Sequence, residues 1–338
     1  MTQKTSESDQ IGAEASAVRP SSAGSGAALF VERYYLQLGV LLLLVILALA
    51  VPRFATGANA ANIMTQASFA GLIACGMTLL IAGGLFDLSV AGIVALAAVI
   101  AGTLLPHTTI GLAAGAGLAV GVGLGILNGI VVTKIRIPPF IATFGMYNIY
   151  LAAAFILTDG NVLPIVSTHY RAMGTASFGG IPGIFLVFSG VCVLSHLLLY
   201  RTRFGRQLRA VGSSEPAARM GGIPVDRIKI VAFALTGLFT ALAAVGLSAL
   251  LSSANGTMAT GIELTAITIA VVGGTALRGG QGTLVGTFTG AIFITSVSNA
   301  LNLLGVQSYW QTIGVGAILV LTLVVGSLTS RTRIRGAE

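Results

Sequence analysis

Charge is the scarcest feature of this 338-residue sequence, in which Asp, Glu, Lys and Arg make up 8% of the residues and hydrophobic residues 55%. A water-soluble domain has about a quarter of its residues charged, because its surface must stay hydrated. The low charge excludes an ordinary soluble protein. It predicts an all-α polytopic membrane protein.

Cysteine and histidine are also scarce, with two cysteines and three histidines. Cys75 and Cys192 each stand alone in an apolar segment, which is typical of a small buried residue rather than a disulfide or a metal ligand. His107, His169 and His196 have no second ligand at helical spacing. The sequence therefore predicts no metal site and no histidine proton relay.

Catalytic motifs are missing as well. None of the three lysines lies in a phosphate-binding loop of the form G-x-x-x-x-G-K-[ST], and no nucleophile elbow or HExxH motif occurs. We expect a chain that is not an enzyme and holds no cofactor of its own. The net charge of +8 does not indicate nucleic acid, because the basic residues lie in short loops beside apolar segments, next to membrane lipid.

The distribution of apolar residues predicts one membrane domain between two tails. Residues 1–30 are polar and rich in Ser, Ala and Gly, which is typical of a disordered tail. Residues 31–330 are expected to form the transmembrane domain, and 331–338 a second tail. Ten segments approach the ~20 residues needed to cross a bilayer; they are 35–51, 62–84, 88–105, 110–133, 138–158, 183–200, 228–251, 264–277, 282–304 and 309–328.

Basic residues set the expected orientation of these segments. With the N-terminus inside and the spans alternating, only Arg53 and Arg171 of the 18 basic residues fall outside. This asymmetry follows the positive-inside rule and predicts ten spans with both termini in the cytoplasm. The longest external loop is then 159–182, which is either an external docking surface or a plain connection.

Glycine is abundant, with 45 residues, and it recurs every fourth position in two segments. One series occupies positions 117, 121, 125 and 129, and the other occupies 282, 286 and 290. Small residues at this spacing form a flat helix face against which a second helix packs closely. Both series therefore predict tight helix crossings.

Polar residues within the apolar segments are the candidates for a translocation pathway. Asp87, with Ser89 beside it, either lines a pathway or caps a structural turn. Glu263 either stabilises a helix start or faces an outer vestibule, and Asn255 lies in the loop before it. Four amides either contact a polyhydroxyl substrate or form hydrogen bonds between helices; they are Asn128, Asn148, Asn299 and Asn302.

The longest polar run after the N-terminal tail is 201–229, which contains seven basic residues. Ser214 is a good N-cap, Glu215 suits a first helical turn, and Gly221 or Gly222 suits a helix end. We therefore expect a short helix over 214–220. Ala217 and Ala218 would give it a smooth surface that fits a partner's groove; the alternative is a helix resting on lipid headgroups.

The pattern E-x-A-A-x-x-x-G-I at 215–223 resembles the coupling helix of ABC importer permeases. Other stretches are similar to the ribose and simple-sugar branch of that family; they are GGLFDLSVAGIVALAA at 83–98, IPPFIATFGM at 137–146, RTRFGRQLRAVGSSEPAARMGGI at 201–223, VVGGTALRGGQGTLVGTFTGA at 271–291 and NALNLLGVQSYWQ at 299–311. The resemblance covers most of the chain from about residue 35 onward.

The resemblance implies about ten spans and a dimeric pore in a bacterial inner membrane, formed by two copies or by two related chains. It implies a periplasmic binding protein that delivers substrate and a cytoplasmic ATPase that holds ATP and magnesium. The residues expected to couple to that ATPase are Gly205, Arg206, Ser214, Glu215, Ala217, Ala218, Gly221, Gly222 and Ile223.

The sequence as a whole thus predicts the permease subunit of an ATP-driven monosaccharide importer. The nearest alternative is a branched-chain amino-acid permease of the same architecture. An ion-coupled secondary transporter is a weaker alternative, because it usually has several ionisable groups within its spans. A membrane enzyme would need a catalytic constellation, for which the sequence gives no sign.

Overall fold

The computed structural model describes residues 26–335. Contacts divide the chain into two units, Met1–Gly39 and Val40–Glu338, and the arrangement below is that of the second unit. Most of the predicted N-terminal tail, residues 1–25, and the last three residues of the predicted C-terminal tail lie outside the described residues.

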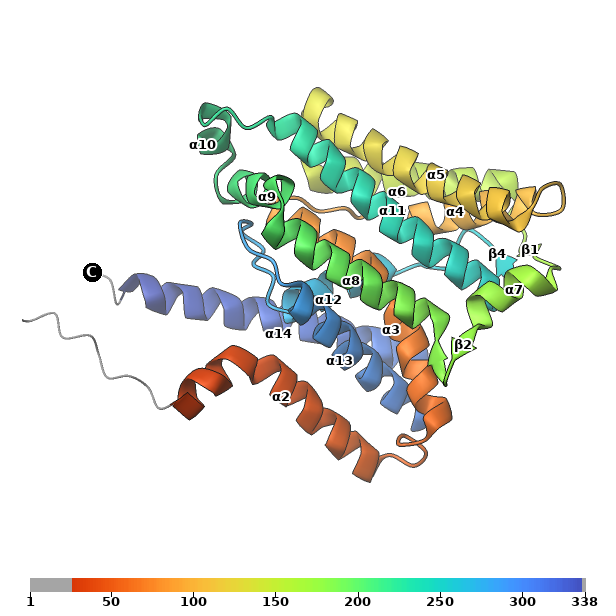
Figure 1. Cartoon of the computed structure of the whole chain (residues 1–338), viewed down its shortest axis with the longest axis horizontal. Helices are drawn as coiled ribbons and strands as arrows, with labels where there is room; N and C mark the ends of the chain where they lie inside the picture. Colours follow the sequence, from red (N-terminus) through yellow and green to blue (C-terminus); the bar gives the residue numbers. More distant parts are fainter. Residues whose placement is uncertain (1–25, 336–338) are drawn as a thin grey trace, which may run out of the picture. The chain divides into compact units, whose positions relative to one another are not determined.

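The described chain is almost entirely helical (Figure 1). Its helices are α2 (Gly26–Ala50), α3 (Gly57–Ala82), α4 (Val90–Leu104), α5 (Ile110–Ile130) with the π-helical turn η1 (Val131–Ile135), α6 (Pro139–Leu157), α7 (Thr168–Thr175), α8 (Gly183–Arg201), α9 (Arg203–Ser213), α10 (Glu215–Met220), α11 (Val225–Leu251), α12 (Ile262–Val272), α13 (Leu284–Leu303) and α14 (Ser308–Arg335). Four two-residue strands form two antiparallel pairs; they are β1 (Leu163–Pro164) with β4 (Ser253–Ala254), and β2 (Ser177–Phe178) with β3 (Ile181–Pro182).

Six helices in the described chain are long and apolar enough to cross a membrane, namely α3, α5 with η1, α6, α8, α11 and α13. The other four predicted spans fall on shorter apolar stretches, in α2, α4, α12 and α14. The structure thus supports a helical membrane protein, and the exact number of ten spans stays a prediction.

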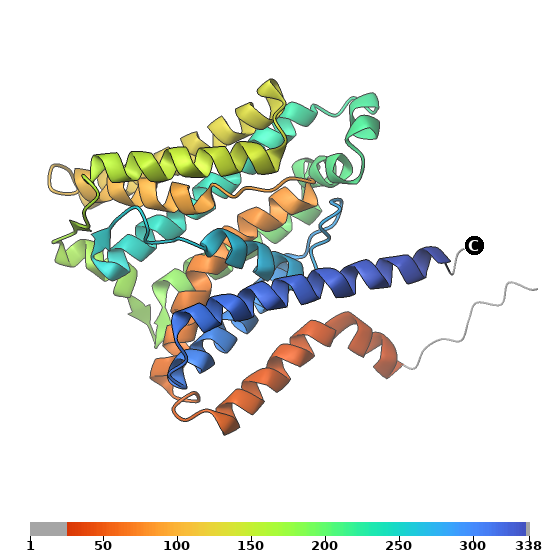
Figure 2. The ribbon, with the colours of Figure 1, turned by 180° about the vertical axis from the view of Figure 1, so that it is seen from behind.

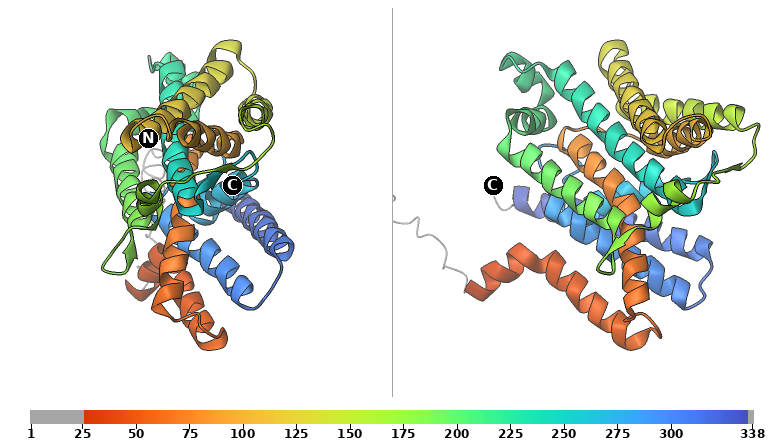
Figure 3. Two further views of the ribbon diagram at one scale, coloured as in Figure 1. Left: turned by 90° about the vertical axis from the view of Figure 1, so that its right-hand side faces the viewer. Right: turned by 45° about the vertical axis from the view of Figure 1, so that its right-hand side comes forward.

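Helix α3 is the centre of the bundle. It contains no charged residue, and every residue from 67 to 82 is buried. Helices α8, α11, α12 and α13 pack around it. The opposite views in Figures 1 and 2 both show α3 in the middle of the bundle. In the end-on view of Figure 3, α5 and α6 lie on one side of α11. Helices α13 and α14 lie on the opposite side of the bundle.

The glycine series form close helix crossings, as the sequence predicts. A methyl group on Gly121 of α5 would collide with the carbonyl oxygen of Gly237 on α11, and the reverse is also true. Gly286 of α13 stands in the same relation to Gly273 at the end of α12. In a bilayer the hydrophobic effect does not drive helices together, because lipid tails are as apolar as the side chains. Dispersion contacts between close backbones stabilise these crossings instead.

Two breaks interrupt the helical bundle, the first largely buried and the second partly exposed. Residues 83–89 separate α3 from α4, and residues 273–283 separate α12 from α13. Glycines with positive φ turn the chain in both breaks; Gly84 has φ 73° and Gly274 has φ 88°. The second break reaches the end of the molecule where α9 and α10 lie, as Figure 1 shows, whereas α7, β1 and β4 lie at the opposite end.

Helices extend into both predicted tails. Helix α2 begins at Gly26, where Ala27, Ala28 and Leu29 are good helix formers, and α14 runs to Arg335. The bounds of the transmembrane domain stay a prediction. The 159–182 segment holds α7 and three short strands, so the fold is not strictly all-α.

Candidate functional site

The polar run at 201–229 contains a helix that the sequence reading missed. Helix α9 begins after Thr202, whose hydroxyl accepts the N–H of Gly205 at 3.2 Å. Its buried face consists of Gly205, Leu208 and Val211, and the spacing of three residues is the signal that identifies such a helix from sequence. Gly205 is required there because a side chain would collide with the carbonyl groups at the end of α8.

Helix α10 follows directly and corresponds to the short helix predicted at 214–220. Ser214 lies between the two helices, and its hydroxyl accepts the N–H of Ala217 at 3.4 Å as an N-cap. At the far end Gly222 has φ 76°, and the N–H of Ile223 returns to the carbonyl of Ala218 at 3.0 Å. This is the left-handed helix ending that glycine favours.

The coupling candidates divide between the two faces of this segment. Ala218 and Gly205 are buried, and Ile223 is half-buried against the core. Glu215 is half-buried, and the exposed members are Arg206, Ser214, Ala217, Gly221 and Gly222. The exposed face is therefore small, smooth and flanked by charge.

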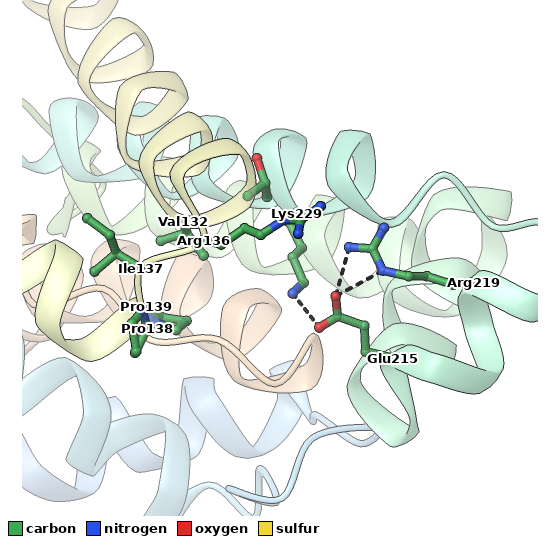
Figure 4. Close-up of a pocket in the computed structure, with 9 residues that line it drawn as sticks. Val132, Arg136, Ile137, Pro138, Pro139, Glu215, Arg219 and Lys229 are labelled. Carbon is green, nitrogen blue, oxygen red and sulfur yellow. Dashed lines mark hydrogen bonds and ion pairs between the residues drawn. The ribbon is translucent and has the colours of Figure 1, made fainter.

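Five charged side chains tie α10 to neighbouring elements, as Figure 4 shows in part. Glu215 accepts from Arg219 at 2.9 Å and from Lys229 at 2.6 Å. Arg219 also donates to Asp226 at 2.9 Å, and Lys134 of η1 donates to the other oxygen of Asp226 at 2.9 Å. The network joins α10 to the start of α11 and the end of α5. Burial raises the pKa of Glu215, but the hydrogen bonds from Lys229 and Arg219 outweigh it, so the pKa lies below its usual value.

A cavity of about 530 Å³ opens beside this network. One wall comes from the end of α5 and the turn into α6, and the other comes from α10 and α11 (Figure 4). The lining residues are Val132, Thr133, Arg136, Ile137, Pro138, Pro139, Glu215, Arg219 and Lys229.

The end of α8 connects this region to the second break. The hydroxyl of Tyr200 donates to the carbonyl of Gly282 at 2.6 Å. The guanidinium of Arg209 on α9 lies over the Tyr200 ring, 4.9 Å from its centre. Such cation–π contacts hold a cation against an aromatic face.

The first break carries a fully buried polar network around Asp87. Ser89 donates its backbone N–H and its hydroxyl to one oxygen of Asp87, at 2.8 and 2.6 Å. Asn128 of α5 donates to the other oxygen at 3.2 Å and to the Ser89 hydroxyl at 2.7 Å. The hydroxyl of Tyr150 on α6 donates to Asn128 at 2.8 Å. The structure thus brings together three of the pathway candidates and adds Tyr150.

The remaining pathway candidates lie apart from this network. Asn299 of α13 pairs with Asn59 of α3 through two amide hydrogen bonds of 2.9 Å. Asn148 and Asn302 are exposed on α6 and at the end of α13. The side-chain Oδ1 of Asn255 accepts the N–H of Thr257, and Glu263 accepts the N–H of Gly261 at the start of α12.

Sequence reasoning missed the partners that complete both networks. No local motif marks Tyr150, Asn59 or Asp226. Each forms its hydrogen bond with a residue more than 20 positions away in the sequence. In the sequence, Lys134 and Lys229 indicate only the topology. Only the packing of the helices brings these residues together.

Fold and site together define a class, that of polytopic helical membrane permeases with a charged segment at one end. The chain belongs to the family described as branched-chain amino acid transport system / permease component, whose model matches residues 59–323. No solved structure matches the chain significantly.

Curated relatives match over nearly the whole chain. The ribose import permease protein RbsC of Bacillus subtilis is 38% identical over 85% of this chain and 90% of its own length. The L-arabinose transport system permease protein AraH of Escherichia coli is 35% identical over 90% of this chain and 95% of its own. The ribose import permease protein RbsC of E. coli is 36% identical over 89% of this chain and 97% of its own length. The resemblance noted from the motifs is thereby confirmed.

Proposed function

We propose that the chain is the membrane-spanning permease subunit of an ATP-driven importer that carries a monosaccharide across a bacterial inner membrane. The observation that carries this proposal is the match, over about nine-tenths of the chain, to permeases named for ribose and for L-arabinose. The apolar helices around α3 suit a chain that lies within a bilayer.

The partners follow from the same proposal. A cytoplasmic ATPase hydrolyses ATP with magnesium, a periplasmic binding protein delivers the sugar, and a second permease chain completes the pore. The chain crosses the membrane ten times with both termini in the cytoplasm. Support for this topology comes from the basic residues, because only Arg53 and Arg171 lie outside in it.

Helix α10 is the proposed coupling helix. It is short and capped, and its exposed surface is smooth enough to enter a groove of the ATPase. The ion pairs of Glu215 and Arg219 hold it against α11, and Asp226 of α11 also pairs with Lys134 of η1. A movement of α10 is thus passed to α11 and, through Asp226, to the end of α5. ATP binding would thus produce a rigid-body change that opens the pore to alternate sides.

Asp87, Ser89 and Asn128 have a positioning role in this proposal. Their polar atoms satisfy one another and are buried, so they fix the break between α3 and α4 beside the pathway. The other predicted pathway candidates lie outside this hydrogen-bond network; they are Asn148, Asn255, Glu263, Asn299 and Asn302.

Purification from the native host in mild detergent, followed by reconstitution, tests the proposal. We expect an ATPase and a binding protein to co-purify, and the reconstituted complex to take up labelled ribose or arabinose only with ATP. Uptake of leucine in place of sugar would support the amino-acid function that the family description names. Uptake by the isolated chain under an ion gradient would overturn the proposal.

A further inference from the structure

The cavity beside α10 has more positive than negative charge. Its lining includes the cations Arg136, Arg219 and Lys229 against one anion, Glu215. Glu215 and the nearby Asp226 are already occupied by Arg219, Lys229 and Lys134. Among the described residues, Arg136 makes no ion pair, so the cavity contains a cation whose charge is not balanced.

The backbone holds Arg136 in place rather than leaving it on a flexible loop. Arg136 has φ 64°, in the left-handed region, and it ends the π-helical turn η1. Pro138 and Pro139 follow after one residue and restrict the chain at the start of α6. A left-handed non-glycine residue is energetically costly, and such strain gathers at functional sites.

Exposed apolar side chains lie next to lining residues of the cavity in the chain. Ile135, beside Arg136, is 63% exposed, and Phe140, beside Pro139, is 62% exposed. Met220, beside Arg219, is 84% exposed. A cation among exposed apolar side chains is typical of a protein interface, in which Arg and Met are enriched. Glu215 and Arg219 of α10 form part of the cavity wall, so the cavity lies directly beside α10.

We propose that this cavity is a second docking contact for the ATPase, in which Arg136 receives an acidic side chain of that subunit while α10 occupies its groove. The inference rests on the proposed function and extends it. The two contacts grip the ATPase at α10 and at the α5–α6 turn, so the ATPase moves both elements together.

Charge reversal at Arg136 provides the first test. We expect Arg136→Glu to lower the amount of ATPase that co-purifies per permease about tenfold, because a matched charge pair becomes a repulsive one. Arg136→Gln should give an intermediate loss. The matched control is Arg203→Glu on α9, an exposed arginine of the same polar run that lies outside the cavity. Equal ATPase recovery from Arg136→Glu and wild type would overturn the inference.

A cross-linking experiment identifies the occupant directly. Cys75 and Cys192 are both buried, so Arg136→Cys introduces an exposed thiol that a maleimide–benzophenone reagent modifies selectively. We expect irradiation of the purified complex to join position 136 to an Asp- or Glu-containing peptide of the ATPase. Labelling of phospholipid alone, or of no ATPase peptide, would overturn the inference.

The helix variant Gly222→Trp separates the two proposals. If Gly222→Trp loses the ATPase but Arg136→Glu keeps it, α10 is the coupling helix and the cavity inference is wrong. If no ATPase co-purifies with the wild-type chain, the proposed function itself fails. Monodisperse elution of each variant in size-exclusion chromatography shows that a loss of binding is not a loss of folding.

Discussion

Gly212 of α9 lies directly against Ala82, the last residue of α3. A methyl group at position 212 would collide with the carbonyl oxygen of Ala82 and would lie 2.7 Å from the nitrogen of Gly280. The same carbonyl accepts the N–H of Gly280 at 2.9 Å. Three backbones therefore touch at one point: the segment that leads into α10, the end of the central helix and the second break.

This contact forms a direct path from α10 into the membrane domain. Helix α3 runs on from Ala82 into the break that contains Asp87. Close-packed backbones have little room to yield, so a displacement of α9 is expected to move the end of α3. The contact explains why position 212 has to be glycine.

The first prediction concerns this contact. Gly212→Val should push α9 away from α3, at a cost of about 1–3 kcal/mol for overpacking. Sugar uptake by the reconstituted complex should fall more than the ATPase rate does, because the link between them is disturbed. The measurement is the ratio of sugar taken up to ATP hydrolysed. The control is Gly145→Val on α6, where a side chain meets nothing within 4 Å; an unchanged ratio in Gly212→Val would remove the contact from the coupling path.

The second prediction concerns α10. Glu215→Arg places a third cation beside Arg219 and Lys229, and Gly222→Trp forces a bulky residue into a backbone with φ 76°. Both variants should abolish ATP-driven uptake while their membrane insertion stays normal, as judged by the amount of permease in washed membranes. Full uptake by both variants would show that α10 does not couple to the ATPase.

The third prediction concerns Asp87. Asp87→Ala removes the acceptor for Ser89 and Asn128 and leaves buried donors without a partner, at about 1–3 kcal/mol for each. Transport should therefore fall more in Asp87→Ala than in Asn299→Ala, since Asn299 lies away from both breaks and its side-chain amide bonds to Asn59. Initial uptake rates at equal permease levels provide the comparison. Wild-type rates in both variants would remove the role of Asp87.

The fourth prediction concerns stability at the other end of α3. Asn59 and Asn299 form a closed amide pair next to the small core of Val51, Phe54 and Ile63. The variants Asn59→Leu and Asn299→Leu should each destabilise the protein, and the double variant should cost less than the sum of both. We expect a coupling of about 0.5–1.7 kcal/mol in the free energy of unfolding, measured in detergent. Strict additivity would mean that the pair contributes nothing as a pair.

The sequence by itself determined the class of protein and the coarse arrangement of its elements. Low charge and long apolar segments specify a helical membrane protein, because bilayer thickness sets the length of a span. The Ser214 cap and the glycines at 221 and 222 specify α10, since caps act between residues a few positions apart. The glycine series at 117–129 specifies a close crossing by the same local logic.

Only the tertiary structure decided which residues meet. It placed Asn128 on Asp87, Asn59 on Asn299 and Lys134 on Asp226, pairs separated by 41, 240 and 92 positions. It also created the cavity around Arg136 and the contact between Gly212 and Ala82, neither of which any local pattern signals. The physical reason is that the periodicity of apolar residues indicates which face of a helix is apolar. The partner of each polar group depends instead on how the helices cross.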